Sequence, residues 1–209
     1  MRNELRGIVW RICGLWLVST VVYGGTPEEL HELLESEVTT WRWHFGAVPG
    51  AESPQFDDSH WKQVQVGHKW WTEHSTCWYR TQVRVPEKVN GLPVHGSTLW
   101  LRLGVDNEAK AYVNGTFRGQ FEWEGEIVLA DQAQPGQVIT VALDCINRPG
   151  YGSLYKAELA SSVSAPLVDP LRKLLEDCDT TTSDAPFADK EEVEYWSSKV
   201  EAALRQVDL

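Results

Sequence analysis

The sequence has few basic residues, and several signatures of catalysis are missing from it. Nineteen Lys and Arg against thirty Asp and Glu give a formal net charge of -11. Because a chain this acidic, with no basic cluster, repels phosphate backbones, nucleic acid is a poor candidate partner. The Gly-x-Ser-x-Gly motif of serine hydrolases is absent, and so is a glycine-rich loop that could hold a phosphate. A neutral ligand such as a sugar is compatible with this composition.

A long apolar run that could cross a membrane is also missing. Residues 12–23 are apolar apart from Ser19 and Thr20, but this run is short for a membrane span. Arginines precede it and Gly24-Gly25 follows it, which is the pattern of a secretory signal peptide. We therefore expect a signal peptide over residues 1–25 and a secreted or periplasmic protein. An uncleaved membrane anchor, a mis-assigned start and a buried strand are the alternatives.

Cysteine is scarce, with four in the whole chain. Beyond the signal region Cys77, Cys145 and Cys178 remain, and an odd number leaves at least one unpaired within the chain. Cys77 and Cys145 each share strand parity with apolar neighbours, so both are predicted to point inward. Buried thiols and a Cys77–Cys145 disulfide both remain open.

Tryptophan is abundant, with 11 residues in 209, and short alternating stretches dominate the middle of the chain. Asn114-Gly115 is a strong hairpin signal and Pro135-Gly136 is a turn signal. Short strands separated by turns every 8–12 residues are typical of a β-sandwich or jelly roll. Strands are expected at residues 41–45, 62–66, 78–85, 98–105, 109–113, 116–121, 127–129, 137–145 and 154–159.

Helices are expected at both ends of this sandwich. Thr26-Pro27 is typical of a helix start, and Asp169-Pro170 is predicted to cap a second helix. A third helix, after a capping box at Asp189 and Glu192, carries an apolar stripe. The predicted organisation is a signal peptide (1–25), a linking helix (26–40), a β-sandwich (41–161) and a helical tail (162–209).

A turn is predicted between Phe56 and Trp61, where Asp57-Asp58-Ser59 supplies short side chains that cap turns and helix starts. Calcium would need six to eight oxygen ligands, and no neighbouring acidic series is visible. A capping role is therefore preferred to a metal site.

Several motifs, in order, resemble one known family. They are Phe56-Asp57-Asp58-Ser59-His60-Trp61, His68…Trp70, Trp78-Tyr79-Arg80, Gly104-Val105-Asp106, Ala111-Tyr112-Val113-Asn114-Gly115 and Pro135-Gly136-Gln137. The stretch from about residue 40 to 160 resembles the N-terminal sugar-binding-like domain of family 2 glycoside hydrolases. The resemblance implies a mainly β, galactose-binding-like jelly roll that accompanies a catalytic domain. A similar module precedes the catalytic region of some bacterial α-mannosidase-type hydrolases, where helices follow it.

Two features depart from the family pattern. Gly67-His68-Lys69-Trp70 stands where family 2 domains often have Pro-His-Asp-Trp, and the loop from Asn147 to Gly152 is short. In the family, the catalytic acids belong to a domain that this chain does not contain. The resemblance therefore implies a module without a catalytic centre of its own.

Candidate chemistry within the chain is sparse. Glu122, Glu124 and Glu126 lie close in sequence, but a solvated loop or hairpin tip is preferred to a pair of glycosidase carboxylates. The spacing of His68, Glu73 and His74 matches no zinc arrangement. No metal and no cofactor is predicted.

Sugar sites combine an aromatic face for the apolar side of the ring with polar groups for the hydroxyls. The loops 67–76 and 147–153 supply most of the candidates, and a structural role at the ends of the sandwich is the alternative for Trp70 and Trp78. The candidate ligand-binding residues are Trp70, Trp71, Glu73, His74, Trp78, Arg80, Trp123, Asn147, Arg148 and Tyr151.

The sequence thus predicts a non-catalytic carbohydrate-binding or accessory domain of a secreted glycoside hydrolase. Its expected partners are carbohydrate and a catalytic glycosidase domain or partner chain. A structural docking module for such a catalytic domain and a stand-alone glycosidase are the alternative hypotheses.

Overall fold

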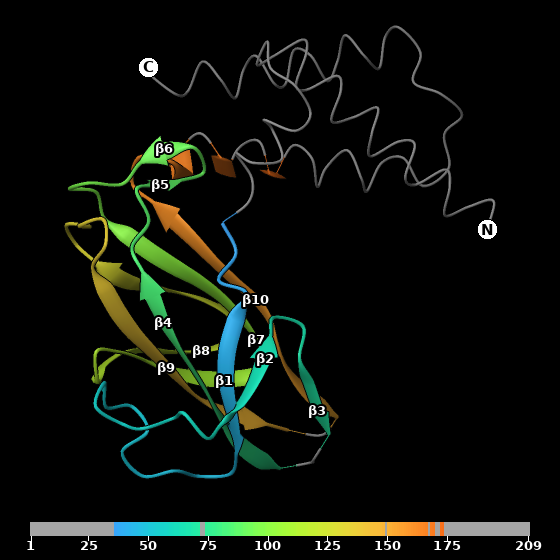
Figure 1. Ribbon diagram of the computed structural model, residues 1–209. Helices are drawn as coiled ribbons and strands as arrows, with labels where there is room; N and C mark the ends of the chain where they lie inside the picture. Colours follow the sequence, from blue (N-terminus) through green and yellow to red (C-terminus); the bar gives the residue numbers. More distant parts are fainter. Residues whose placement is uncertain (1–35, 72–73, 149, 167, 170–171, 174–209) are drawn as a thin grey trace, which may run out of the picture. The chain divides into compact units, whose positions relative to one another are not determined.

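The computed structural model describes residues 36–71, 74–148, 150–166, 168–169 and 172–173 (Figure 1). The chain divides into two compact units, one of which is residues 36–162. The predicted signal peptide, most of the linking helix, Glu73, Cys178 and the last predicted helix lie outside the described residues. Within the described part, no helix is long and apolar enough to cross a membrane.

The unit 36–162 is built from antiparallel strands, so the predicted mainly β sandwich is confirmed. The strands of the main sheet follow the order β2-β1-β4-β9-β7-β10-β3, and β8 pairs with β7. Their bounds are β1 Thr40–Phe45, β2 Lys62–Gln65, β3 Lys69–Trp71, β4 Ser75–Arg84, β7 Leu99–Val113, β8 Thr116–Ala130, β9 Val138–Asn147 and β10 Tyr151–Ser161. Two short strands, β5 (Lys88–Val89) and β6 (Leu92–Pro93), form a separate hairpin.

The sheet curls until its two edge strands lie side by side (Figure 1). β2 and β3 are at opposite ends of the strand order, yet only residues 66–68 separate them in sequence. The N–H of Gly67 donates to the carbonyl of Leu154 on β10 at 2.7 Å. The backbone of Glu37 also forms an isolated antiparallel β-bridge with that of Glu158 on β10. These bonds join the two ends of the sheet and close the sandwich over its core.

Two strands are longer than the sequence pattern predicted. The separate strands expected at 98–105 and 109–113 are one continuous β7, and those expected at 116–121 and 127–129 are one β8. The pairing of β7 with β8 shifts register between Gly104 and Glu108. This irregularity interrupts the alternation of side chains, which is why the sequence pattern read each strand as two.

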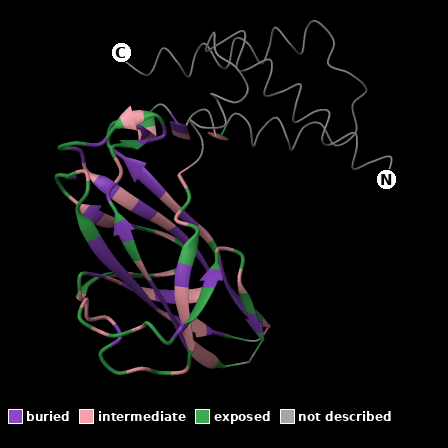
Figure 2. Ribbon diagram, in the orientation of Figure 1, coloured by how far each residue is buried: buried purple, intermediate pink, exposed green. Residues whose placement is uncertain are grey.

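The core is formed by the inward side chains of the long strands, along which buried positions are interspersed with intermediate or exposed ones (Figure 2). Fully buried members include Tyr79, Leu101, Leu103, Val105, Ile139, Leu143 and Leu154. Cys77 and Cys145 are paired in register on β4 and β9, and both are fully buried, as predicted. Both are free thiols, and the hydrogen bond to Cys77 together with burial raises the pKa of Cys145.

One predicted helix start is wrong. Helical residues begin at Ala165, and the N–H of Val168 donates to the carbonyl of Ser164 at 2.9 Å. Asp169 therefore lies within helical backbone and does not cap its start. The sequence pattern favoured Asp169 because Pro170 follows it, and Pro is common in the first turn of a helix.

Trp70 anchors the short edge strand β3 to the core. Its side chain is only 6% exposed and packs edge-on against Tyr79, with ring centroids 5.8 Å apart. Gly152 pairs with it on β10, and a Cβ on this glycine would lie 2.2 Å from the Trp70 ring. Because Gly152 has no side chain, the Trp70 indole can pack directly against its backbone.

We therefore predict that Gly152→Ala lowers the free energy of unfolding by about 1–3 kcal/mol, the usual cost of overpacking a core. Gly119→Ala, also within a strand, is the matched control because a Cβ there meets no atom within 4 Å. Urea denaturation of both variants measures the difference. Equal stabilities of the two variants would contradict the packing role of Gly152.

Candidate functional site

An exposed pair of aromatic rings lies at the edge formed by β3 and β10. Trp71 and Tyr151 are register partners, and their rings are stacked with centroids 6.3 Å apart and planes inclined by 30°. They are 71% and 41% exposed, respectively. The Lys69 ammonium lies 4.6 Å from the centre of the Tyr151 ring. Lys69, Trp71 and Tyr151 are called the aromatic platform below.

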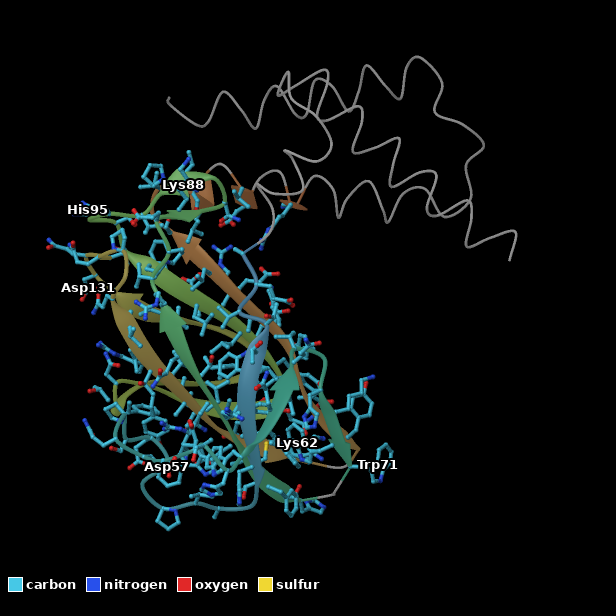
Figure 3. All side chains as sticks on the ribbon, in the orientation of Figure 1. Asp57, Lys62, Trp71, Lys88, His95 and Asp131 are labelled. Carbon is cyan, nitrogen blue, oxygen red and sulfur yellow. The ribbon has the colours of Figure 1, made fainter. Side chains whose placement is uncertain are left out.

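Strand alternation explains why one tryptophan of the doublet is buried and the next is exposed. Successive side chains of a strand point to opposite faces. In β3, Trp70 takes the core side, so Lys69 and Trp71 take the outer side. Figure 3 shows the Trp71 side chain projecting from the edge of the ribbon into solvent. The structure thus brings together two of the predicted candidates, Trp71 and Tyr151.

Trp78 and Arg80 are two of the predicted ligand-binding residues, but a loop covers the face of β4 on which they lie. Trp78 is 6% exposed and clusters with Trp61, Ala51 and Ala142. Its ring lies 6.0 Å from that of Tyr112. The segment between β1 and β2 folds over this face and forms a second, smaller core.

Arg80 holds that covering segment in place. It is 2% exposed, and its Nε donates to Asp58 at 2.7 Å. Its Nη1 donates to the carbonyls of Ala51 and Ser53, and the guanidinium lies 5.4 Å from the centre of the Phe56 ring. Arg80 is therefore a buried structural residue and does not occupy the surface position predicted for a sugar ligand.

The turn at Asp57-Asp58-Ser59 is confirmed, with the two carboxylates in different roles. Asp57 accepts a hydrogen bond from the N–H of Ser59 at 3.0 Å, and its hydrogen bonds with Ser59 lower the pKa of Asp57. Asp58 forms the ion pair with Arg80. The capping role was visible in the sequence, whereas the ion pair joins residues 22 positions apart.

The loop after β9 is held by polar contacts. Asn147, a predicted ligand residue, is fully buried and donates to the carbonyl of Gly150 at 3.2 Å. Arg148 is exposed, and its Nη2 lies 3.1 Å from both Glu108 and Glu122. Its N–H donates to Asn107 Oδ1 at 2.6 Å. Asn147 thus faces inward, while Arg148 remains at the surface within a pair of ion pairs.

Glu122, Glu124 and Glu126 lie within β8 and not in the loop that was expected. Each carboxylate pairs with a different cation. The partners are Arg148 at 3.1 Å for Glu122, Lys156 at 3.3 Å for Glu124 and Arg102 at 2.9 Å for Glu126. This arrangement assigns the three carboxylates to ion pairs along β8.

Two further predicted candidates, Trp123 and His74, are exposed and lie outside the aromatic platform. Trp123 is 53% exposed, has a φ of 62°, and its carbonyl accepts a hydrogen bond from the Tyr155 hydroxyl at 3.0 Å. His74 is exposed and has a φ of 51°. Its neighbour Glu73 lies outside the described residues. No group of three His, Cys, Asp or Glu among the described residues could hold a metal ion.

The sequence reasoning also missed a groove of about 470 Å³ along the edge strand β2. Lys62 and His68 line it, and both lie against the ring of Trp43, at 5.8 Å and 4.9 Å from its centre. His68 Nδ1 is 3.2 Å from the Tyr79 hydroxyl. Burial, and then the charge of Lys62, lowers the pKa of His68. Both effects favour the neutral imidazole.

Comparison with solved structures finds the same fold in part of known β-glucuronidases. The crystal structure of a Bacteroides uniformis β-glucuronidase superimposes with a TM-score of 0.51 and 22% identity, covering 60% of this chain and 17% of that one. The fold is that of a domain found in β-glucuronidases. The predicted resemblance to a domain of family 2 glycoside hydrolases is thereby confirmed for the fold.

Other solved structures match in the same way. B. uniformis β-glucuronidase 2, covalently bound to cyclophellitol-6-carboxylate aziridine, matches with a TM-score of 0.51 and 22% identity, over 61% of this chain and 17% of that one. A family 2 glycosyl hydrolase from Bacteroides cellulosilyticus gives 0.49 and 20%, over 60% and 20%. The chain spans about a sixth of the length of the β-glucuronidases. No protein-family profile and no curated protein sequence matches it.

Arg80 gives a direct test of the division between buried and surface candidates. Arg80→Met leaves Asp58 and two carbonyls without their donor, so we expect a loss of about 2–4 kcal/mol in the free energy of unfolding. Arg102→Met is the matched control, because the pair of Arg102 with Glu126 is more exposed, and should cost about 1 kcal/mol or less. Denaturant unfolding measures both. If both variants lose a similarly small part of the free energy of unfolding, the buried contacts of Arg80 do not stabilise the covering segment.

Proposed function

We propose that this chain is a non-catalytic carbohydrate-binding or accessory domain of a glycoside hydrolase, and that carbohydrate binds at the aromatic platform. The observation that supports this most is the stacked, exposed pair of Trp71 and Tyr151. Among the tryptophans of the described residues only Trp71 and Trp123 are exposed, and Trp71 is the more exposed of the two. Exposed aromatic patches commonly mark binding sites. A secreted or periplasmic location remains part of this proposal.

The chemistry of the platform suits a sugar. The apolar C–H face of a pyranose ring can pack on an indole or phenol ring, while its hydroxyls need polar partners at the rim. Lys69 supplies three N–H donors beside Tyr151. The backbone that carries the two rings is ordered before any ligand arrives, since Trp71 belongs to β3 and Tyr151 to β10. Such a preformed surface loses little conformational freedom on binding.

The likeness to β-glucuronidases supports the glycosidase setting of the proposal. In those enzymes the matched part is 17% of the chain. We therefore propose a catalytic glycosidase domain, in the same polypeptide or in a partner, as the second expected partner. The binding experiment below identifies the sugar that is recognised.

The proposal is tested by titrating the full chain with mannose-, galactose- and glucose-containing polysaccharides, using affinity gel electrophoresis and tryptophan fluorescence. We expect at least one to bind, and Trp71→Ala to raise the Kd tenfold or more, about 1.4 kcal/mol. Phe117→Ala is the matched control, because Phe117 is a 53% exposed aromatic residue on β8 outside the platform. It should leave binding unchanged.

Two results would overturn the proposal. If no polysaccharide binds the native chain, the carbohydrate-binding role is wrong. If one binds with equal affinity to the native chain and to Trp71→Ala, the platform is the wrong site. Thermal unfolding of each variant confirms that a loss of binding does not come from a loss of the fold.

A docking module for a catalytic domain is the second candidate. The same exposed rings favour it, because aromatic residues are enriched where protein surfaces meet. It predicts that the full chain binds none of the polysaccharides, and that Trp71→Ala weakens its association with a separately produced glycosidase domain from the same genome. Retention of that association by Trp71→Ala would exclude docking through the platform.

A further inference from the structure

Next to the aromatic platform, the outer face of the sheet carries two polar residues that the sequence pattern did not single out. Ser153 on β10 pairs with Lys69 on one side and with Asp106 of β7 on the other. The neighbouring Leu154 and Val105 are fully buried in the core, so Ser153 and Asp106 face the opposite way. Ser153 and Asp106 are called the polar floor below.

The polar floor has capacity for hydrogen bonds that the described residues do not fill. Ser153 is only 3% exposed, yet its hydroxyl forms no hydrogen bond with another described side chain or carbonyl. Asp106 accepts one hydrogen bond, from Asn107 Nδ2 at 2.7 Å, and pairs with no cation among the described residues. Burial raises the pKa of Asp106. A buried hydroxyl and an unpaired carboxylate side by side are suited to accept and donate hydrogen bonds to a polar ligand.

Tyr155 forms the far side of this floor. It is 41% exposed, and its ring lies over Gly104, where a Cβ would be 2.4 Å from the ring. Its hydroxyl donates to the Trp123 carbonyl at 3.0 Å, which fixes the ring from the other end. Burial, and then the charges of Glu124 and Asp106, raises the pKa of Tyr155.

The outer face therefore presents the aromatic platform at one end, the polar floor in the middle and the ring of Tyr155 at the other end. Tyr151 and Tyr155 are four residues apart with a bulge between Leu154 and Lys156, which separates them by roughly 10–13 Å along the strand. That distance exceeds the width of a single sugar ring. A ligand that reaches both ends has to be a chain of sugars.

We propose that the platform, the polar floor and Tyr155 form one extended site for a linear oligosaccharide. This inference rests on the proposed function and deepens it. One sugar packs on Trp71 and Tyr151, another packs on Tyr155, and hydroxyls between them bond to Ser153 and Asp106. The site then recognises an internal segment of a polysaccharide and not a single sugar at a chain end.

The experiment compares dimers with hexamers. Calorimetric titration of the full chain with β-1,4-linked manno-, galacto- and gluco-oligosaccharides of two and six units gives the Kd for each length. For the sugar that binds, we expect the hexamer to bind at least tenfold more tightly than the dimer. Tyr155→Ala should abolish that gain and leave the dimer unchanged, whereas Trp71→Ala should weaken both lengths. Tyr155→Phe keeps the ring and should keep the gain.

Asp106→Asn provides a second test with little change in shape, in case Tyr155→Ala disturbs the fold. It should raise the Kd for the hexamer several-fold and leave the dimer unaffected, and Phe117→Ala should change neither. If the native chain binds dimer and hexamer equally, or if neither Tyr155→Ala nor Asp106→Asn weakens the hexamer, the extended site is wrong while the proposed function stands. If neither length of any sugar binds, both proposals fail together.

Discussion

The fold depends on the hydrogen-bond pairing of one long strand, β7, with three others. Its first part, Leu99 to Asp106, pairs with β10, and its second part, Glu108 to Val113, pairs with β9. β8 follows it along its other side. Because β9 and β10 separate where β7 changes partner, one strand belongs to both layers of the sandwich. The loop between β9 and β10 is tied to this point by the hydrogen bond from Arg148 to Asn107. Asp106 is the last residue of β7 to pair with β10. The polar floor therefore lies where β7 changes its pairing partner.

The sequence was enough to predict the architecture because most strands keep a strict period of two. In β4, for example, Cys77, Tyr79 and Val83 are buried as their parity requires. The bulge in β10 could not be predicted. In an unbroken strand Tyr155 would share a face with Ala157 and Leu159, which are in the core. The extra residue at the bulge instead puts Leu154 inside and Tyr155 outside. A one-residue shift in register thus decides whether an aromatic ring belongs to the core or to the surface.

The candidate site was predicted in part for a related reason. Trp71 and Tyr151 are exposed, and successive side chains of a strand point to opposite faces, so Trp70 and Trp71 cannot both enter the core. Trp78 and Arg80 were also on the outer face of their strand, but the segment between β1 and β2 covers them. Parity tells which face of a sheet a residue occupies, and it does not tell which loops cover that face. Contacts such as Arg80 with Asp58 join positions far apart in sequence, so only the folded chain reveals them.

The central claim is that ligand binds at the exposed Trp71 and not at the tryptophans buried in the two cores. Each tryptophan gives one indole N–H signal in a ¹H–¹⁵N NMR spectrum, and Trp71→Phe identifies the signal of Trp71. On titration with a hexasaccharide of the polysaccharide that binds, we predict that this signal moves progressively while those of Trp41, Trp61, Trp70 and Trp78 stay in place. A Trp71 signal that remains fixed while the buried tryptophans shift would contradict the account.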